Sequence, residues 1–179
     1  MNSSLKKLHA QAEIYTATSE PLKQLNPLLL ARFYEYYQDE DVVRTHLFNG
    51  RYENIYLNER HIPELAQLRQ QASRWANLIL GTAQIDMGYW FNYMPAGAVT
   101  TAHRHDDDDE LLSAAYYISV PENSGDIIIQ TADEPVRITP EAGSFIFFKP
   151  DMVHEVTENL STQDRFSIGI NFGRRETPD

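Results

Sequence analysis

The chain has 179 residues, 42% of them hydrophobic and 23% charged, values typical of one globular domain. It contains no cysteine, which excludes disulfides, a thiolate nucleophile and cysteine-bound zinc. The net charge of −11 argues against nucleic acid as a partner, because nucleic-acid binding depends on neutralising phosphates with Lys and Arg. No apolar run approaches the roughly 20 residues of a membrane span, and residues 1–12 lack the apolar region of a signal peptide. We therefore expect a cytoplasmic protein without a membrane partner.

The first half of the chain, residues 1–88, is predicted to be a mostly helical support region. Residues 12–18 have the composition of one short strand. Asn26 and Pro27 are residue types favoured at an N-cap and at the first helical position, so a helix is predicted to begin there and to continue to Tyr37.

A second helix is predicted over residues 62–80, where apolar residues recur at spacings of three and four. Gly81 follows this run, as expected at the end of a helix. Both helices are expected to pack against a sheet. The apolar stripe of the second helix is formed by Leu65, Leu68, Ala72, Trp75 and Ile79.

The second half changes to short strands separated by Pro, Gly, Asn and Asp turn signals. Several strands at this spacing predict a sandwich or barrel, supported by the helices of the first half. The fold class is thus mainly β with supporting α, in one domain over residues 1–179 with a β core at 89–175. The strands are predicted at residues 89–92, 99–105, 112–120, 126–131, 136–139, 144–148 and 165–172.

His105, Asp107 and His154 have the residue types of a metal site. Two histidines and one carboxylate can hold iron(II) on one face of an octahedron and leave three positions open. His105 and Asp107 are separated by one residue, so they lie on the same side of an extended segment. His154 can reach them from a distant strand. We predict these three residues as metal ligands and as the catalytic centre.

Arg165 and Ser167 follow on the last predicted strand, eleven and thirteen residues after His154. A 2-oxo acid that chelates the metal needs a fixed cation for its far carboxylate, and the planar fork of Arg165 suits that role. Ser167 shares its side of the strand and can add a hydrogen bond. Tyr117 is a further candidate contact. The predicted co-substrate ligands are therefore Arg165, Ser167 and Tyr117.

The stretch from Trp90 to Phe172 resembles the double-stranded β-helix (a jelly-roll, cupin-like fold) of 2-oxoglutarate/iron(II)-dependent oxygenases. Within that family it is most similar to small bacterial members related to prolyl hydroxylases. The resemblance implies iron(II) as cofactor, 2-oxoglutarate as co-substrate, and its decarboxylation to succinate with hydroxylation or another oxidation of a substrate. The matching pieces are Gly97 and residues 112–117, 124–126, 140–143, 154–156 and 165–171.

The metal pair has an alternative. Related sequences often place the first ligand six residues after the turn glycine, and six residues after Gly97 is His103. Counting back from the strand that begins at Leu112 favours His105 with Asp107. His103, His105 and Asp107 share strand parity, so alternation does not decide. We choose His105 and Asp107, which complete the carboxylate triad, and keep His103 as the alternate ligand.

A cupin is the main competing hypothesis. The spacing after Gly97 fits the first cupin metal motif, which would use His103, His105, Glu110 and His154. Such a protein could be an enzyme or a binding module, but it gives no reason for Arg165. A metal-free β-barrel is the non-enzyme alternative.

The substrate itself is not readable from the sequence. A small molecule, a peptide and a protein all remain candidates, and a homodimer is left open. The five consecutive acids at residues 106–110 favour a basic substrate.

Overall fold

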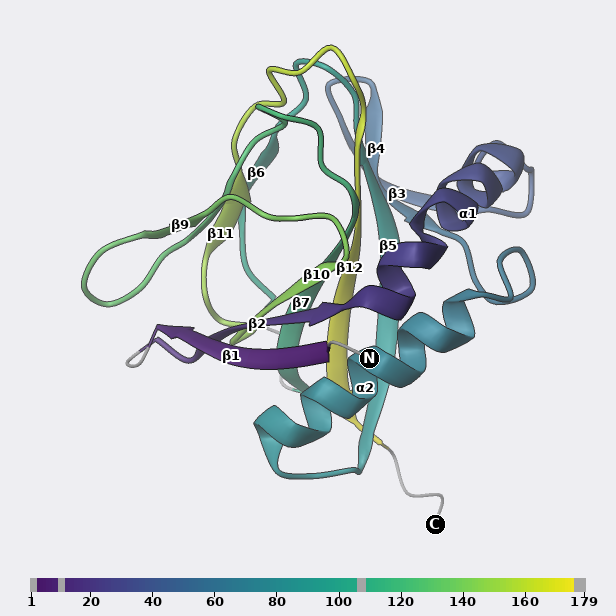
Figure 1. Ribbon diagram of the computed structural model, residues 1–179. Helices are drawn as coiled ribbons and strands as arrows, with labels where there is room; N and C mark the ends of the chain where they lie inside the picture. The colour runs from purple at the N-terminus through teal and green to yellow at the C-terminus, as the bar shows by residue number, and fades with distance from the viewer. Residues whose placement is uncertain (1–2, 10–11, 106–108, 176–179) are drawn as a thin grey trace.

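The computed structural model describes residues 3–9, 12–105 and 109–175, which form two antiparallel sheets and two helices. Figure 1 shows the helices on one side of the larger sheet, with the smaller sheet beyond its other side. The mainly β fold predicted for this chain is confirmed. No helix in the described part of the chain is long and apolar enough to cross a membrane.

The larger sheet has eight strands. Their order is β1 (Ser3–His9), β2 (Ile14–Ser19), β10 (Ser144–Phe148), β7 (Glu110–Ser119), β12 (Arg165–Arg174), β5 (Ile85–Met94), β4 (Arg51–Tyr56) and β3 (Val43–Phe48). The smaller sheet has four strands, in the order β6 (Thr100–His103), β11 (His154–Val156), β8 (Ile127–Ile129) and β9 (Val136–Ile138).

Helix α1 (Glu20–Tyr36) begins seven residues before the predicted first helical residue, Pro27. Ser19 is its N-cap, and a proline stands at one of the first two helical positions, so the start signals lie further upstream. Pro27 is inside the helix. Asn26 is buried, and its amide donates to the carbonyl of Ile118 at 2.8 Å. The prediction that Asn26 caps the helix is wrong, because its side chain serves a tertiary contact instead.

Helix α2 (Leu65–Leu80) confirms the second helical prediction. Gly81 ends it in the left-handed conformation, with φ of 68°, which glycine adopts without steric cost. Four of the five residues of its predicted stripe are buried, namely Leu65, Leu68, Ala72 and Trp75.

Strands β1, β3 and β4 in the first half were not predicted. The first two are edge strands of the larger sheet, and β3 has no buried residue. Alternation of apolar and polar residues arises when one face of a strand is buried, so exposed edge strands lack that signal.

Two apolar cores flank the larger sheet. One lies between this sheet and the helices and includes Phe33, Phe91 and Phe166. The other includes Tyr117, Ile129 and Phe148, which come from both sheets. Neighbouring residues on β7 alternate between these cores. Side chains that face the smaller sheet, such as Tyr117, are therefore available to a site between the two sheets.

Candidate metal centre and co-substrate pocket

Three histidines converge between the two sheets. His103 at the end of β6 and His154 at the start of β11 are direct antiparallel partners, and His105 follows two residues after His103. The ring centroids of His103 and His154 lie 4.3 Å apart, and that of His105 lies 5.2 Å and 5.3 Å from them. One nitrogen from each ring lies within 4.8 Å of the others, so the three can share one metal ion.

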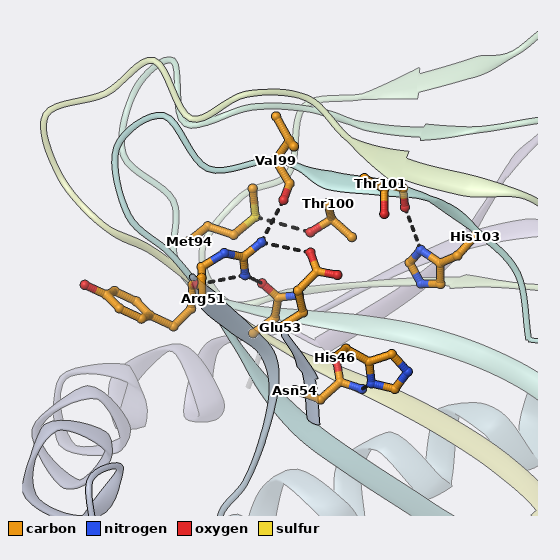
Figure 2. A network of polar contacts seen from close by, with 11 residues as sticks. His46, Arg51, Glu53, Asn54, Met94, Val99, Thr100, Thr101 and His103 are labelled. Atoms are coloured by element: carbon orange, nitrogen blue, oxygen red, sulfur yellow. Dashed lines mark hydrogen bonds and ion pairs between the residues drawn. The ribbon is translucent and has the colours of Figure 1, made fainter. Parts of the chain in front are cut away.

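The environment of His103 and His154 fits metal coordination. Nδ1 of His103 lies 2.8 Å from the carbonyl oxygen of Thr101, as Figure 2 shows, and Nδ1 of His154 lies 3.0 Å from that of Met152. Metal-bound histidines commonly donate their second N–H in this way, which leaves the other nitrogen free to bind. Burial, together with the neighbouring His103, lowers the pKa of His154 to about 3, so this ring is neutral at pH 7. A neutral imidazole is a ligand that suits iron(II) among other divalent metals.

The structure describes two of the three predicted metal ligands. His105 and His154 lie in the cluster, and so does the alternate ligand His103. Asp107 lies outside the described residues. Glu110, which the cupin hypothesis requires as a ligand, is not part of the cluster of potential metal ligands. Its Oε1 instead accepts a hydrogen bond from Asn171 at 2.5 Å.

A pocket behind the histidines holds the predicted co-substrate residues. Its walls include Arg165, Ser167 and Tyr117 together with all three histidines, so the fold brings these six predicted residues to one cavity. Arg165 begins β12, and Ser167 lies on the same face two residues later, level with Tyr117 on β7. Strand alternation thus places the Arg165-x-Ser167 pair as the sequence predicts.

Arg165 is a buried cation, with 1% of its surface exposed. Its Nη1 donates to the carbonyl of Ser124 at 3.1 Å and also to that of Gly125. The guanidinium carbon lies 5.2 Å from the centre of the Tyr117 ring. Burial lowers the pKa of Arg165, and its Nε is buried without a hydrogen-bond partner.

No carboxylate in the described part of the chain forms an ion pair with Arg165. A buried guanidinium normally has such a partner, because desolvating an unpaired charge costs several kcal/mol, about the penalty per ion found in real proteins. The orphaned Nε and the unpaired charge therefore fit a carboxylate ligand such as the far end of 2-oxoglutarate.

Sequence reasoning gave no role to Trp90 or Asn171, which also line this pocket. Trp90 lies opposite Gly169 in the β5–β12 ladder, and its indole occupies the space that a larger residue at 169 would need. Asn171 shares the parity of Arg165 and Ser167 on β12, so alternation alone could have placed it on the pocket face.

Comparison with known proteins identifies the family. Residues 88–171 match the sequence model of a family described as putative 2OG-Fe(II) oxygenases. This stretch, just under half of the 179 residues, belongs to the 2-oxoglutarate/iron(II) oxygenase family. Iron(II) and 2-oxoglutarate are thus the cofactor and co-substrate of this oxygenase, as the sequence resemblance implies. None of the curated proteins matches the chain significantly.

Solved structures share the fold. A prolyl-4-hydroxylase from Pseudomonas putida is 20% identical, with 93% of this chain and 95% of that chain covered and a TM-score of 0.68. The α-ketoglutarate-dependent carbocyclase SnoK of nogalamycin biosynthesis is 15% identical, with 92% and 80% covered and a TM-score of 0.72. A Trichoplax adhaerens prolyl hydroxylase, solved with a peptide of hypoxia inducible factor, is 18% identical, with 84% and 79% covered and a TM-score of 0.63.

These likenesses confirm the predicted double-stranded β-helix of the oxygenase. The cytoplasmic location and the homodimer stay predictions.

Proposed function

We propose that this oxygenase decarboxylates 2-oxoglutarate to succinate and couples that step to hydroxylation or another oxidation of a substrate. The observation that carries the proposal is Arg165, a buried cation without a carboxylate partner among the described residues, in the same pocket as the three histidines. Bound iron(II) supplies the redox chemistry and the activation of dioxygen.

We propose that His154 and the histidines at 103 and 105 surround the iron, and that Arg165 binds the far carboxylate of 2-oxoglutarate. Ser167 and Tyr117 complete the carboxylate site. Asp107 stays a predicted ligand. Arg165 orients the co-substrate because its guanidinium is fixed by two backbone carbonyls and by the face of Tyr117. The apolar core around Tyr117 and Phe148 keeps water from this end of the pocket.

The substrate is proposed to bind in a second cleft of about 460 Å³ that opens on the histidines. Residues of the β3–β4 hairpin form one wall of this cleft. Apart from His103 and His105, the lining residues include His46, Glu53, Asn54, Tyr56, Trp90, Thr100, Arg104 and Glu110. The oxidised C–H bond of a substrate in this cleft would lie next to the metal.

Arg51 holds the hairpin wall in place, as Figure 2 shows. Its guanidinium donates to the carbonyl of Val99 at 2.7 Å and to Glu53 Oε1 at 2.8 Å. It also donates to the carbonyl of Tyr93 at 3.0 Å. Strand β4 of the hairpin forms a single ladder pair with β5, Ile55 with Phe91. Arg51 therefore fixes both the position of the wall and the carboxylate that faces the cleft.

We propose a basic substrate because two carboxylates, Glu53 and Glu110, line the cleft against one guanidinium, that of Arg104, with Glu53 also paired to Arg51. N-acetyl-lysine amide and N-acetyl-arginine amide are suitable probes, with N-acetyl-norleucine amide as the uncharged control. The proposal expects the basic compounds to raise succinate formation above the rate without substrate. Equal rates with the lysine, arginine and norleucine compounds would count against it.

The central proposal is tested with the metal-free protein. Iron(II) is added without oxygen and 2-oxoglutarate is titrated while the weak visible charge-transfer band of the chelate is recorded. We expect the band, and succinate once air is admitted. His154→Ala is the control and should abolish both. Absence of both signals in the wild-type protein would refute the proposed function.

A further inference from the structure

A buried asparagine that does not line the co-substrate pocket supports the end of the pocket at which Arg165 lies. Asn159 lies in the connection between β11 and β12 and is 1% exposed. Its Nδ2 donates to the carbonyl oxygens of Met94 and Gln163, each at 2.9 Å, and its Oδ1 accepts from the backbone N–H of Ser161 at 3.0 Å. The amide nitrogen and the amide oxygen are thus both paired, as expected for a buried polar side chain.

Two of these contacts close the end of the β5–β12 ladder to which Arg165 belongs. Met94 is the last residue of β5 and the ladder partner of Arg165. Gln163 lies two residues before Arg165 in the chain. The Asn159 amide therefore joins the end of one strand to the segment that enters the other. This side chain fixes the direction in which β12 begins, and with it the position of the Arg165 backbone.

The backbone next to Asn159 holds the second support of Arg165, which is the turn that accepts hydrogen bonds from its guanidinium. The N–H of Leu160 donates to the carbonyl of Asn123 at 2.9 Å. The next two carbonyls of that turn, in the Ser124–Gly125 dipeptide, accept from Nη1 of Arg165. One short segment of chain is thus linked to the Arg165 backbone and also to the acceptors of its side chain.

Asn159 is itself anchored to the connection between β5 and β6. Its carbonyl accepts from the N–H of Gly97 at 2.8 Å, and its own N–H donates to the carbonyl of Ala98 at 2.9 Å. These two hydrogen bonds hold the backbone of Asn159 in place, so its side chain can act as a fixed link between β5 and the start of β12.

We propose that Asn159 is a positioning residue for the co-substrate, which sets the place at which Arg165 meets the far carboxylate of 2-oxoglutarate. It acts on Arg165 in two ways, through the start of β12 and through the turn that holds the guanidinium. The inference rests on the proposed function, because it takes Arg165 as the partner of that carboxylate. Asn159 does not line the co-substrate pocket, so its loss should weaken binding through Arg165.

Replacing Asn159 by alanine tests this role. 2-Oxoglutarate and 2-oxobutanoate, which lacks the far carboxylate, are each titrated without oxygen into the iron(II)-loaded protein, and the affinity is read from the charge-transfer band. Asn159→Ala should bind 2-oxoglutarate about tenfold more weakly, close to the lower limit of what a hydrogen bond to a charged group contributes. Its affinity for 2-oxobutanoate should be nearly unchanged.

Leu68→Ala is the matched control for general loss of stability. Leu68 is a buried residue of α2, in the core between the helices and the larger sheet, and its truncation also destabilises the protein. This variant should keep the wild-type preference for 2-oxoglutarate over 2-oxobutanoate. A change of preference in Asn159→Ala alone then reports the position of Arg165. Circular dichroism checks that both variants are folded.

A measurement on the wild-type protein keeps the inference testable if Asn159→Ala does not fold. Coupling between two sites is reciprocal, so a carboxylate bound by Arg165 should stabilise the segment that positions Arg165. Hydrogen exchange at the backbone N–H groups of Asn159 and Leu160 should be slower with saturating 2-oxoglutarate than with saturating 2-oxobutanoate. The N–H groups of helix α2 are the internal reference and should exchange equally with both acids.

Two results would overturn the inference: an Asn159→Ala protein that keeps the wild-type preference, or equal exchange at Asn159 and Leu160 with the two acids. Weaker binding of both acids by the same factor would also overturn it, since Asn159 would then support the pocket as a whole. A wild-type protein without any preference between the acids is a different outcome. It refutes the proposed role of Arg165, and the inference with it.

Discussion

Replacing Arg165 by glutamine removes the one charge that the pocket offers to the far carboxylate of 2-oxoglutarate, while keeping a polar side chain of similar length. The guanidinium is 1% exposed, so the lost interaction is not screened by water. A hydrogen bond to a charged group contributes about 1.5–3 kcal/mol, and about 1.4 kcal/mol corresponds to a factor of ten in affinity. We therefore expect Arg165→Gln to weaken 2-oxoglutarate binding by about 10- to 150-fold.

The affinity is measured from the charge-transfer band of the iron(II)-loaded protein without oxygen. A second titration uses 2-oxobutanoate, which keeps the chelating 2-oxo acid but lacks the far carboxylate. Wild type should prefer 2-oxoglutarate, and Arg165→Gln should lose most of that preference while its affinity for the metal is unchanged. Arg137→Gln is the matched control, because Arg137 is exposed and pairs with Asp126 outside this pocket.

Two results would refute this reasoning about Arg165. One is a variant that binds both 2-oxo acids more weakly by the same factor, which would indicate general damage to the pocket. The other is a loss of metal affinity in parallel with the loss of 2-oxoglutarate. Either result would assign Arg165 to the structure of the Ser124–Gly125 turn, whose carbonyls it contacts.

Two further predictions concern the packing that supports the site. Gly169→Ala would place a methyl group 2.5 Å from the Trp90 indole, so we expect about 1–3 kcal/mol of destabilisation in urea unfolding. Gly88→Ala has open space around it and is the control; equal midpoints for the two variants would contradict the close approach. Asn26→Ala removes the partner of the Tyr116 hydroxyl and the Ile118 carbonyl and should cost about 2–3 kcal/mol, whereas exposed Gln24→Ala should stay within about 0.5 kcal/mol of wild type. Similar losses for Asn26→Ala and Gln24→Ala would show that the buried amide contributes little.

Much of the β core could be predicted from sequence, because its strands and turns depend on residues that are close together in the chain. Turn residues separate short apolar runs, and β10 has the predicted bounds, Ser144–Phe148. Helix α2 was found from the spacing of its apolar residues and from Gly81. Strand alternation also predicted that Arg165 and Ser167 share a face, and both line the pocket.

Other features depend on contacts between distant segments. The start of α1 was misplaced because Asn26 has an N-cap residue type, yet its amide serves strand β7, about 90 residues away. The edge strands β1 and β3 were missed because they bury little apolar surface and so carry no alternation.

The three histidines of the site also combine features that the sequence predicts with features that only tertiary contacts decide. The sequence alone determined that His103, His105 and His154 belong near one site with Arg165, because their types and spacing fit a metal and a 2-oxo acid. It could not separate His103 from His105, since residues two apart on a strand face the same way. The tertiary structure distinguishes them, because β6 pairs with β11 so that His103 lies opposite His154, while β12 brings Asn171 to His105. The carbonyl partners of His103 and His154 lie two residues away in the chain, but the partner of His105 is a long-range contact that local sequence does not encode.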